Sequence, residues 1–373
     1  MKRLLLFILS VLMLLCAVSV ALAEDPIYIG VLDAFTGDRA SSGDYAKEGA
    51  DLAMEHINAK GGVLGRKLEL IYEDDQGNES AATNAFQKIT AEHDLAAVCL
   101  SKYSSIVLAM EQFVADEGIP AICCGSSPRL ETSKTPNLFS SRRSDTGSGV
   151  TIANYCNQLG MKRVAILHAP DALGTGMAPV LQAQFEKLGI ETVSVQQFSP
   201  DEKNFAPYIA KIVDSNCDGI VSMAQQAEAA LIMIAVKEAG LDVPCVGSSA
   251  FAQQIAIQNS AGACEGWYSV SPFSPTAQEE PTKSWIAEYT EKYGRKPDMG
   301  SACMYDAVML FCQAIEATNS TEYDDIINYL KTLKDVPGIA STYSYNGTPM
   351  LATAEFIVQI KDNASVVVSV VKN

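Results

Sequence analysis

Sequence signatures of metal centres, hydrolases and phosphate-binding loops are missing from this chain of 373 residues. There is no C-x-x-C pair, and the three histidines are scattered without metal-ligand spacing. The motifs G-x-S-x-G, H-E-x-x-H, G-x-x-x-x-G-K-[ST] and G-x-G-x-x-G do not occur either. We therefore expect a protein that is not an enzyme and that holds no metal and no cofactor.

Positive charge is also scarce. The chain has 27 Lys and Arg residues against 44 Asp and Glu residues, which gives a formal net charge of −17. Nucleic acids and anionic membrane surfaces would repel such a chain, so neither is an expected partner. A hydrophobic content of 48% indicates a folded globular protein and not a disordered one.

The cysteines do not look like a disulfide framework. Nine of the ten follow Cys16, and an odd number cannot pair completely. Most of them stand in apolar strand-like or helix-like segments, such as AAVCL and AICCG. We expect buried free thiols that pack as small hydrophobic side chains.

The first residues read as a secretion signal. Lys2 and Arg3 precede an apolar stretch from Leu4 to Val20, and Ala21-Leu22-Ala23 is an A-x-A cleavage site. A retained membrane anchor is the competing interpretation, but the cleavage site and the polar residues after it favour removal of residues 1–23. The mature protein is then expected to be periplasmic, without stable membrane insertion.

Strand-like and helix-like segments alternate along the rest of the chain, which is typical of parallel sheets covered by helices. The expected strands are Ile27–Leu32, Leu68–Tyr72, Ala96–Leu100, Ala121–Cys124, Val164–His168, Thr192–Phe198, Gly219–Ser222 and Pro244–Gly247. The expected helices are Gly43–Ala59, Ser80–Glu92, Ser105–Glu117, Gly147–Leu159, Thr175–Leu188, Phe205–Asp214, Ala227–Ala239, Thr282–Tyr293 and Ser301–Ala317. A mature chain of this length suits two lobes better than one core.

The stretch from Ile27 to Asn78 carries the most specific signal. It contains Phe35-Thr36-Gly37 after the first strand, INAKGGVLG at the end of the first helix, and Glu73-Asp74-Asp75 after the second strand. In this order and spacing, the stretch resembles the opening of periplasmic substrate-binding proteins of the branched-chain amino acid (leucine/isoleucine/valine) ABC transport family. The resemblance extends over essentially the whole mature chain and is strongest before residue 130.

The resemblance implies the type I periplasmic-binding fold, an α/β architecture of two doubly wound, Rossmann-like lobes joined by a three-segment hinge. Ser/Pro/Gly-rich segments at 140–145, 269–275 and 336–341 interrupt the periodicity, at about the places where such chains cross between lobes. The expected division is listed by lobe: residues 24–143 plus 272–337 form lobe 1, and residues 144–271 plus 338–373 form lobe 2.

Two loops of the first lobe can hold a carboxylate. Serines follow the strand Ala96–Leu100 in Ser101-Lys102-Tyr103-Ser104-Ser105, and others follow Ala121–Cys124 in Gly125-Ser126-Ser127-Pro128. Parallel sheets bind ligands beyond these strand ends, where helix N-termini offer free N–H groups. The alternative is that these serines only cap helices or turn the chain. The resemblance implies that Ser104 or Ser105, with Gly125, Ser126 and Ser127, holds the α-carboxylate and α-ammonium of an amino acid.

The second lobe departs from the family pattern. Leu173 and Gln225 stand where relatives often have aromatic residues, and near Ser249 there is no carboxylate to neutralise an ammonium. A buried ammonium without a partner costs several kcal/mol. Either another acid supplies the charge, or the ligand has no ammonium. The acids that could do so are Asp145, Asp171, Glu228 and Asp306.

Arg142 and its neighbour Arg143 stand at the first expected crossing between the lobes. Arginine there could brace the hinge, or it could hold a ligand carboxylate from the cleft rim. Aromatic side chains could form walls of the cleft or could simply pack in the cores. The candidates are Tyr103, Phe251, Trp267 and Tyr305.

The expected function is that of an extracytoplasmic solute receptor of an ABC importer. Its ligand would be a small carboxylate-bearing molecule, and its partner would be a membrane permease. The ligand is either a hydrophobic amino acid or an ammonium-free aromatic or 2-oxo acid. A sensor of the same fold that feeds a signalling receptor is the second possibility.

Overall fold

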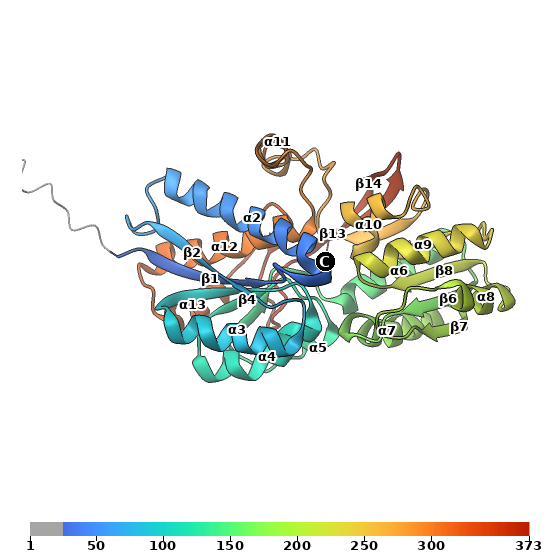
Figure 1. The fold of residues 1–373 in the computed structure, drawn as a ribbon, viewed down its shortest axis with the longest axis horizontal. Helices are drawn as coiled ribbons and strands as arrows, with labels where there is room; N and C mark the ends of the chain where they lie inside the picture. The colour runs from blue at the N-terminus through green and yellow to red at the C-terminus, as the bar shows by residue number, and fades with distance from the viewer. Residues whose placement is uncertain (1–24, 373) are drawn as a thin grey trace, which may run out of the picture.

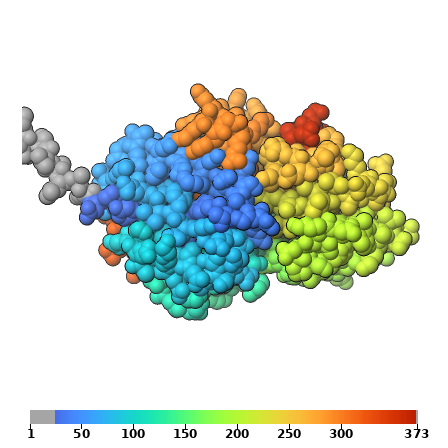
Figure 2. Space-filling view, viewed as in Figure 1, coloured from blue at the N-terminus to red at the C-terminus, as the bar shows by residue number. Residues whose placement is uncertain are grey.

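The computed structural model describes residues 25–372, which form two α/β lobes side by side (Figure 1). The space-filling view shows the first lobe, in blue and cyan, abutting the yellow and green second lobe (Figure 2). The signal peptide predicted for residues 1–23 lies outside the described residues. Within residues 25–372, no helix combines the length and the apolar character needed to cross a bilayer.

The first lobe is built on a parallel sheet of five strands in the order β2-β1-β3-β4-β5. The strands are β1 (Ile27–Asp33), β2 (Leu68–Asp74), β3 (Leu95–Leu100), β4 (Ala121–Cys123) and β5 (Leu138–Ser140). The surrounding helices are η1 (Gly37–Arg39), α2 (Ala40–Ala59), α3 (Glu79–Glu92), α4 (Ser104–Glu117), α5 (Pro128–Glu131), α11 (Thr282–Tyr293), α12 (Met299–Thr318) and α13 (Tyr323–Leu330). Every residue of β3 is buried, as expected for a central strand covered by helices on both faces.

The second lobe repeats the same winding in the order β10-β9-β8-β6-β7 and adds two antiparallel strands, β13 and β14, at one edge. The strands are β6 (Arg163–His168), β7 (Glu191–Gln197), β8 (Gly219–Met223), β9 (Cys245–Gly247), β10 (Tyr268–Ser271), β13 (Ala354–Lys361) and β14 (Ala364–Lys372). The helices are α6 (Asp145–Gln158), α7 (Ala172–Leu188), α8 (Ala206–Asp214), α9 (Gln226–Glu238), η2 (Ser249–Ala252) and α10 (Gln254–Asn259).

The predicted α/β fold of two doubly wound lobes is confirmed, and each strand expected before residue 248 starts and ends within a residue or two of its prediction. The helix-ending glycines also behave as expected, since Gly118 and Gly189 take the left-handed conformation that glycine favours there. The hairpin of β13 and β14 was not predicted. Its signals are apolar alternation and the dipeptide Asp362-Asn363, both at positive φ, which makes a tight turn.

The segment after β11 (Val336–Pro337) packs against the first lobe, whereas the sequence predicts that the second lobe resumes at residue 338. β11 and β12 (Thr342–Tyr343) form a small separate ribbon. Asp306 on α12 accepts hydrogen bonds from Ile339 N at 2.8 Å and from the Tyr343 hydroxyl at 2.6 Å. Leu351 is buried in the same core. We propose that the third crossing lies near Thr353 and not directly after residue 337.

A buried ion pair links two of the crossing segments. Arg143, just after β5, pairs with Glu355 at the start of β13. Ser148 on α6 donates a second hydrogen bond to Glu355 at 2.6 Å, and Thr151 accepts one from Arg143 at 3.1 Å. The crossings are therefore tied together by polar contacts that lie away from solvent.

The cysteines after residue 25 are buried, as predicted, apart from the half-buried Cys217. None of these nine lies in a disulfide within the described chain. Burial raises the pKa of the thiols, for example to about 11 at Cys123 and to about 12 at Cys303. Thiols that stay protonated in an apolar core are unreactive packing groups.

Candidate functional site

A small cavity of about 40 Å³ lies between the lobes. It opens where the carboxyl ends of both parallel sheets face each other, which is the usual place for a ligand in this architecture. The first lobe lines it with Arg39, Lys102, Tyr103, Ser104, Ser105, Ser126, Arg142 and Met299. The second lobe lines it with Asp171, Leu173, Gln225, Ser249, Ala250 and Gln253.

The two serine loops of the first lobe are pinned to each other. Ser104, at the start of α4, accepts hydrogen bonds through Oγ from the backbone N–H groups of Ser126 and Ser127, both at 3.1 Å. A Cβ atom on Gly125 would lie 2.8 Å from Leu130 Cδ1 and 3.1 Å from Ser104 Oγ, so a side chain here would crowd both residues. The backbone groups expected to bind a carboxylate are thus already engaged by Ser104.

The remaining serines hold the lobes together around Ala172, the first residue of α7. Ser105 Oγ accepts from Ala172 N at 3.1 Å, and Ser127 Oγ donates to Ala172 O at 3.0 Å. The lobes approach closely here: Gly176 on α7 lies so near Pro128 that an added Cβ atom would be 2.9 Å from Pro128 Cδ. The structure therefore shows the lobes closed on each other.

Three further side chains of the first lobe donate hydrogen bonds across the cleft. They are Lys102 to Gln253 Oε1 at 3.0 Å, Tyr103 to Gln226 Oε1 at 3.3 Å, and Arg142 to Ser249 Oγ at 3.1 Å. The acceptors are neutral groups. These contacts can break when the lobes separate, since each one joins the two lobes through side chains alone.

The cavity has more positive than negative charge on its walls. Lys102 and Arg142 are each only 8% exposed, and the Arg142 Nε atom has no hydrogen-bond partner. Arg39 lies half-buried with its guanidinium 4.1 Å from the centre of the Tyr103 ring. The single lining carboxylate, Asp171, caps α7 through Gly174 N at 3.0 Å and accepts from Gln225 Nε2 at 2.7 Å.

Buried acids stand behind this wall. Burial, with the neighbouring Asp75, raises the pKa of Asp33 to about 7, and burial raises the pKa of Asp298. Burial also lowers the pKa of Lys102, although the charges of Asp298 and Asp33 oppose that change. Asp145 follows the same rule: burial raises its pKa to about 6 despite the opposing charge of Arg142. These acids balance the cations from within the protein.

The structure brings most of the predicted site residues together. Those that line the cavity are Tyr103, Ser104, Ser105, Ser126, Arg142, Leu173, Gln225 and Ser249. Gly125 and Ser127 lie next to it without lining it. Phe251 stacks on Trp267 in the second core, with ring centroids 5.0 Å apart, and Tyr305 packs in the first core. For these three aromatic residues, the core-packing alternative is the one that holds.

The four acids that were candidates to neutralise a ligand ammonium lie at different distances from the cavity. Asp171 lines the cavity, and Asp145 lies beside Arg142. Glu228 lines neighbouring grooves outside the cavity. Asp306 is buried in the first lobe and holds the chain at Ile339 and Ala340. Only Asp171 could meet a ligand directly.

Sequence reasoning missed five of the residues on the cavity wall, namely Arg39, Lys102, Ala250, Gln253 and Met299. Lys102 had a usable signal, because a cation in a short strand-to-helix loop at the carboxyl edge must lie near the ligand. Arg39 and Gln253 follow other strand ends in the same way. Met299 begins α12, and nothing local in the sequence marks it as a cleft residue.

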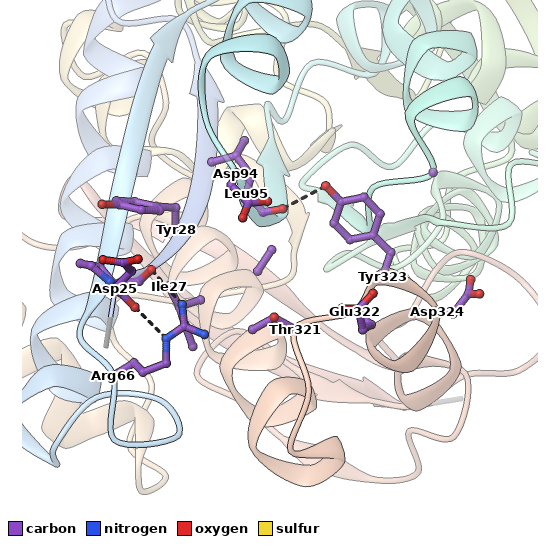
Figure 3. A pocket seen from close by; sticks show the side chains of 13 residues that line it. Asp25, Ile27, Tyr28, Arg66, Asp94, Leu95, Thr321, Glu322, Tyr323 and Asp324 are labelled. Carbon is purple, nitrogen blue, oxygen red and sulfur yellow. Dashed lines mark hydrogen bonds between the residues drawn. The ribbon is translucent and has the colours of Figure 1, made fainter. Parts of the chain in front are cut away.

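A larger open hollow lies at the opposite end of the first lobe, near the beginnings of β1 and β3 (Figure 3). Arg66 donates from Nε to Asp25 O at 2.7 Å, and Tyr323 donates to Leu95 O at 3.1 Å (Figure 3). No residue of the second lobe lines this hollow. It lies at the amino ends of the strands, so it is a weaker candidate than the cleft.

The part of the chain that the structure describes holds no group of three or more His, Cys, Asp or Glu residues placed to bind a metal. A closed cavity with two buried cations, hydroxyl groups and amides is suited to hold a small polar molecule from both sides.

Comparisons with known proteins agree with this arrangement. The family model described as "Periplasmic binding protein" matches residues 26–364. An amino acid binding protein of Pseudomonas aeruginosa is 31% identical over 223 residues, which is 59% of this chain and 59% of that protein. The chain thus spans about 59% of the length of this curated relative.

Solved structures share the fold over nearly the full length. The branched-chain amino acid transporter substrate binding protein of Streptococcus pneumoniae, in complex with isoleucine, aligns with a TM-score of 0.86 at 24% identity and covers 93% of this chain and 100% of that one. A solute binding protein of R. palustris, in complex with 4-hydroxybenzoate, aligns with a TM-score of 0.86 at 18% identity and covers 94% and 98%. The predicted resemblance is confirmed, and the chain belongs to the periplasmic binding protein family.

Proposed function

We propose that this protein is an extracytoplasmic solute receptor of an ABC importer. It captures a small carboxylate-bearing ligand between the lobes, closes by hinge motion and delivers the ligand to a membrane permease. The protein binds its ligand without turning it over. Export to the periplasm through a cleaved signal peptide belongs to the same proposal.

The observation that carries this proposal is the shared cavity. Its walls come from both lobes, and Lys102 and Arg142 each donate across it to the facing lobe. Such contacts exist only when the lobes are closed, so a ligand that fills the cavity favours closure through differential affinity. The relatives named for amino acid binding and for 4-hydroxybenzoate support a small carboxylate as the ligand class.

The direct test is a thermal-shift screen of the purified protein without its signal peptide. Leucine, isoleucine and valine are compared with aromatic and 2-oxo acids, and each hit is confirmed by calorimetry and by the decrease in radius of gyration that closure produces. A ligand at a hundred times its Kd raises stability by about 2.7 kcal/mol, which a melting curve detects. Turnover of a bound compound would contradict the proposal.

The serine loops allow a second test. Ser104→Ala removes the hydroxyl that pins Ser126 and Ser127, and Ser127→Ala removes a donor to Ala172. The double variant is expected to lower ligand affinity by about tenfold or more, since each lost buried hydrogen bond contributes roughly 1 kcal/mol. Ser80→Ala, an exposed serine on α3, is the matched control. Equal affinity in the double variant and the control would show that the loops do not support the site.

A sensor that passes ligand occupancy to a signalling receptor is the second candidate function. It uses the same cleft, so ligand binding does not separate the two. Reconstituted uptake does: a receptor for an importer stimulates ATP hydrolysis by a permease complex encoded beside it, whereas a sensor does not.

A further inference from the structure

We propose that the cleft selects a short organic acid that has no ammonium group, and that its carboxylate lies between Lys102 and Arg142. This inference rests on the proposed receptor function and adds the charge class of the ligand and the place of its carboxylate. The sequence favours the serine loops for the carboxylate and leaves Arg142 as an alternative; we take up that alternative and add Lys102.

Two cationic side chains, Lys102 and Arg142, share the small cavity between the lobes. Lys102 and Arg142 both line the cavity and both are buried. The charge of Arg142 contributes to the lowered pKa of Lys102, so the two head groups are within electrostatic reach of each other. Their mutual repulsion is relieved by an anion placed between them.

Both cations have hydrogen-bond donors that no protein group in the described part of the chain accepts from. Lys102 Nζ has three protons and makes one hydrogen bond, to Gln253. Arg142 donates to Ser249 through Nη2, while its buried Nε atom has no partner. A buried donor without an acceptor is unfavourable, and a carboxylate oxygen is the acceptor that an arginine side chain matches best.

The buried acids near these cations do not line the cavity, so they do not contact a ligand there. Asp33 and Asp298 act on Lys102, and Asp145 acts on Arg142, but none of the three lines the cavity. They act on the cations as buried neighbouring charges and lie outside the cavity wall. An incoming ammonium would meet the cations first.

The cavity wall offers an ammonium a single carboxylate, and both oxygens of that group already accept a hydrogen bond. Asp171 is the one acid on the wall, and its two oxygens accept from Gly174 N and from Gln225 Nε2. The other second-lobe wall residues are neutral. The Ser104 hydroxyl already accepts two N–H groups, so its proton is left to donate. An oxo, hydroxyl or carboxylate oxygen suits that donor, and an ammonium does not.

The size of the ligand follows from the wall. Tyr103, Leu173, Ala250 and Met299 are its apolar members, and the rest of the wall is polar. A long aliphatic side chain would bury lysine, arginine and amide groups without hydrogen bonds. A short acid with a second oxygen-bearing group uses those donors instead.

Calorimetry with matched pairs of compounds tests the charge class, because the members of each pair differ at one substituent. The pairs are 4-methyl-2-oxopentanoate against leucine, 2-oxoglutarate against glutamate, and succinate against aspartate. We expect one or more ammonium-free members to bind, about a hundredfold more tightly than their amino acid partners, since a cation beside two buried cations is strongly unfavourable. Equal or tighter binding of the amino acid member would overturn the inference while supporting the receptor function.

Three variants test the place of the carboxylate. Lys102→Met and Arg142→Met each remove one cation, and each is expected to weaken binding of the ammonium-free ligand by about a hundredfold. Lys134→Met, an exposed lysine, changes net charge equally and serves as the control. Asp171→Asn keeps a helix-capping side chain and removes the one negative charge on the wall, so anion binding is expected to strengthen severalfold. If an ammonium used Asp171, the same variant would weaken binding.

Folding of each variant is checked by circular dichroism and by thermal unfolding without ligand, and the two cation variants are independent of each other. Retention of affinity within about threefold in both would overturn the inference. Failure of every ammonium-free probe to bind would also overturn it. In that case, closure with any other solute in the broad screen keeps the receptor function, and no closure with any solute removes both.

Discussion

Arg142 and Arg143 are neighbours in the chain, yet they belong to two regions with opposite character. Arg142 points into the cleft, where its side chain donates a hydrogen bond to the neutral Ser249 of the facing lobe. Arg143 points into the hinge, where Glu355 pairs with it and accepts a further hydrogen bond from Ser148. Two identical side chains on one connecting segment therefore have different roles, because different distant residues reach each of them.

The contrast shows how the protein separates binding from stability. At the hinge, the protein supplies partners for its own buried charges, so those contacts need no ligand. In the cleft, buried donors at Lys102 and Arg142 are left for a molecule from outside. A binding site needs polar groups whose hydrogen bonds the protein does not satisfy, because such groups give a ligand its differential affinity for the closed form.

The largest effect is expected from breaking the hinge pair. Arg143→Met leaves Glu355 buried without its cation, which is expected to lower the free energy of unfolding by about 3 to 5 kcal/mol. Urea unfolding of the ligand-free protein measures it. The control is Lys67→Met, which breaks the exposed pair with Glu69, at 67% and 37% side-chain exposure. An exposed pair contributes at most about 1 kcal/mol, so equal losses in the two variants would refute the distinction.

The next effect concerns Asp145, which lies between the two regions beside Arg142. Its pKa is raised from 3.8 to about 6 in the folded protein, mainly by burial. The protonated acid therefore favours folding below about pH 4, and this contribution is lost as the pH rises through about 6. Relative to Asp145→Asn, the wild-type protein should lose up to roughly 3 kcal/mol of stability across that range.

Chemical unfolding of both proteins at a series of pH values, without ligand, gives this difference. Asp214→Asn, an exposed carboxylate on α8, is the control for the change in net charge. A wild-type curve parallel to that of Asp145→Asn would mean that Asp145 keeps an ordinary environment in the folded protein.

The smallest effect is expected from a single methyl group at the contact between the lobes. The Cβ atom of Gly176→Ala would lie 2.9 Å from Pro128 Cδ and 3.2 Å from Ser127 Oγ, but only while the lobes are closed. Ligand affinity should fall by about tenfold, which corresponds to 1.4 kcal/mol, while the stability of the open, ligand-free protein stays the same or rises slightly. Calorimetry and thermal unfolding separate these quantities. A loss of stability without a loss of affinity would show that the contact belongs to the fold and not to closure.

The sequence predicted much of the site because the site lies on regular loops. Ser104, Ser126 and Gln225 each follow the end of a strand, and parallel winding brings all such ends to one edge. Lys102 also follows the end of a strand, so its place on the cavity wall was predictable. It was missed because a lysine in a loop is usually a solvated surface residue. Its burial depends on Gln253 and on Asp298, which are far away in sequence.

Other errors also concern long-range packing. Phe251 and Trp267 were possible cleft walls, but they stack on each other inside the second lobe. The hairpin of β13 and β14 completes the second sheet from the end of the chain, and its pairing partner β10 lies far away in sequence. Local patterns specify that a segment is extended or apolar, but they do not specify which neighbour covers it.

The sequence by itself determined the order of strands and helices, the family, and the edge of each sheet where a ligand binds. These follow from local periodicity, helix-ending glycines and the parallel winding that alternation imposes. Only the tertiary structure decided which charges face the cavity. Arg142 and Arg143 have the same chemistry and adjacent positions, and their environments differ because Ser249 and Glu355 reach them from distant parts of the chain. The charge that a buried site offers depends on such distant neighbours, since burial and nearby charges together set it.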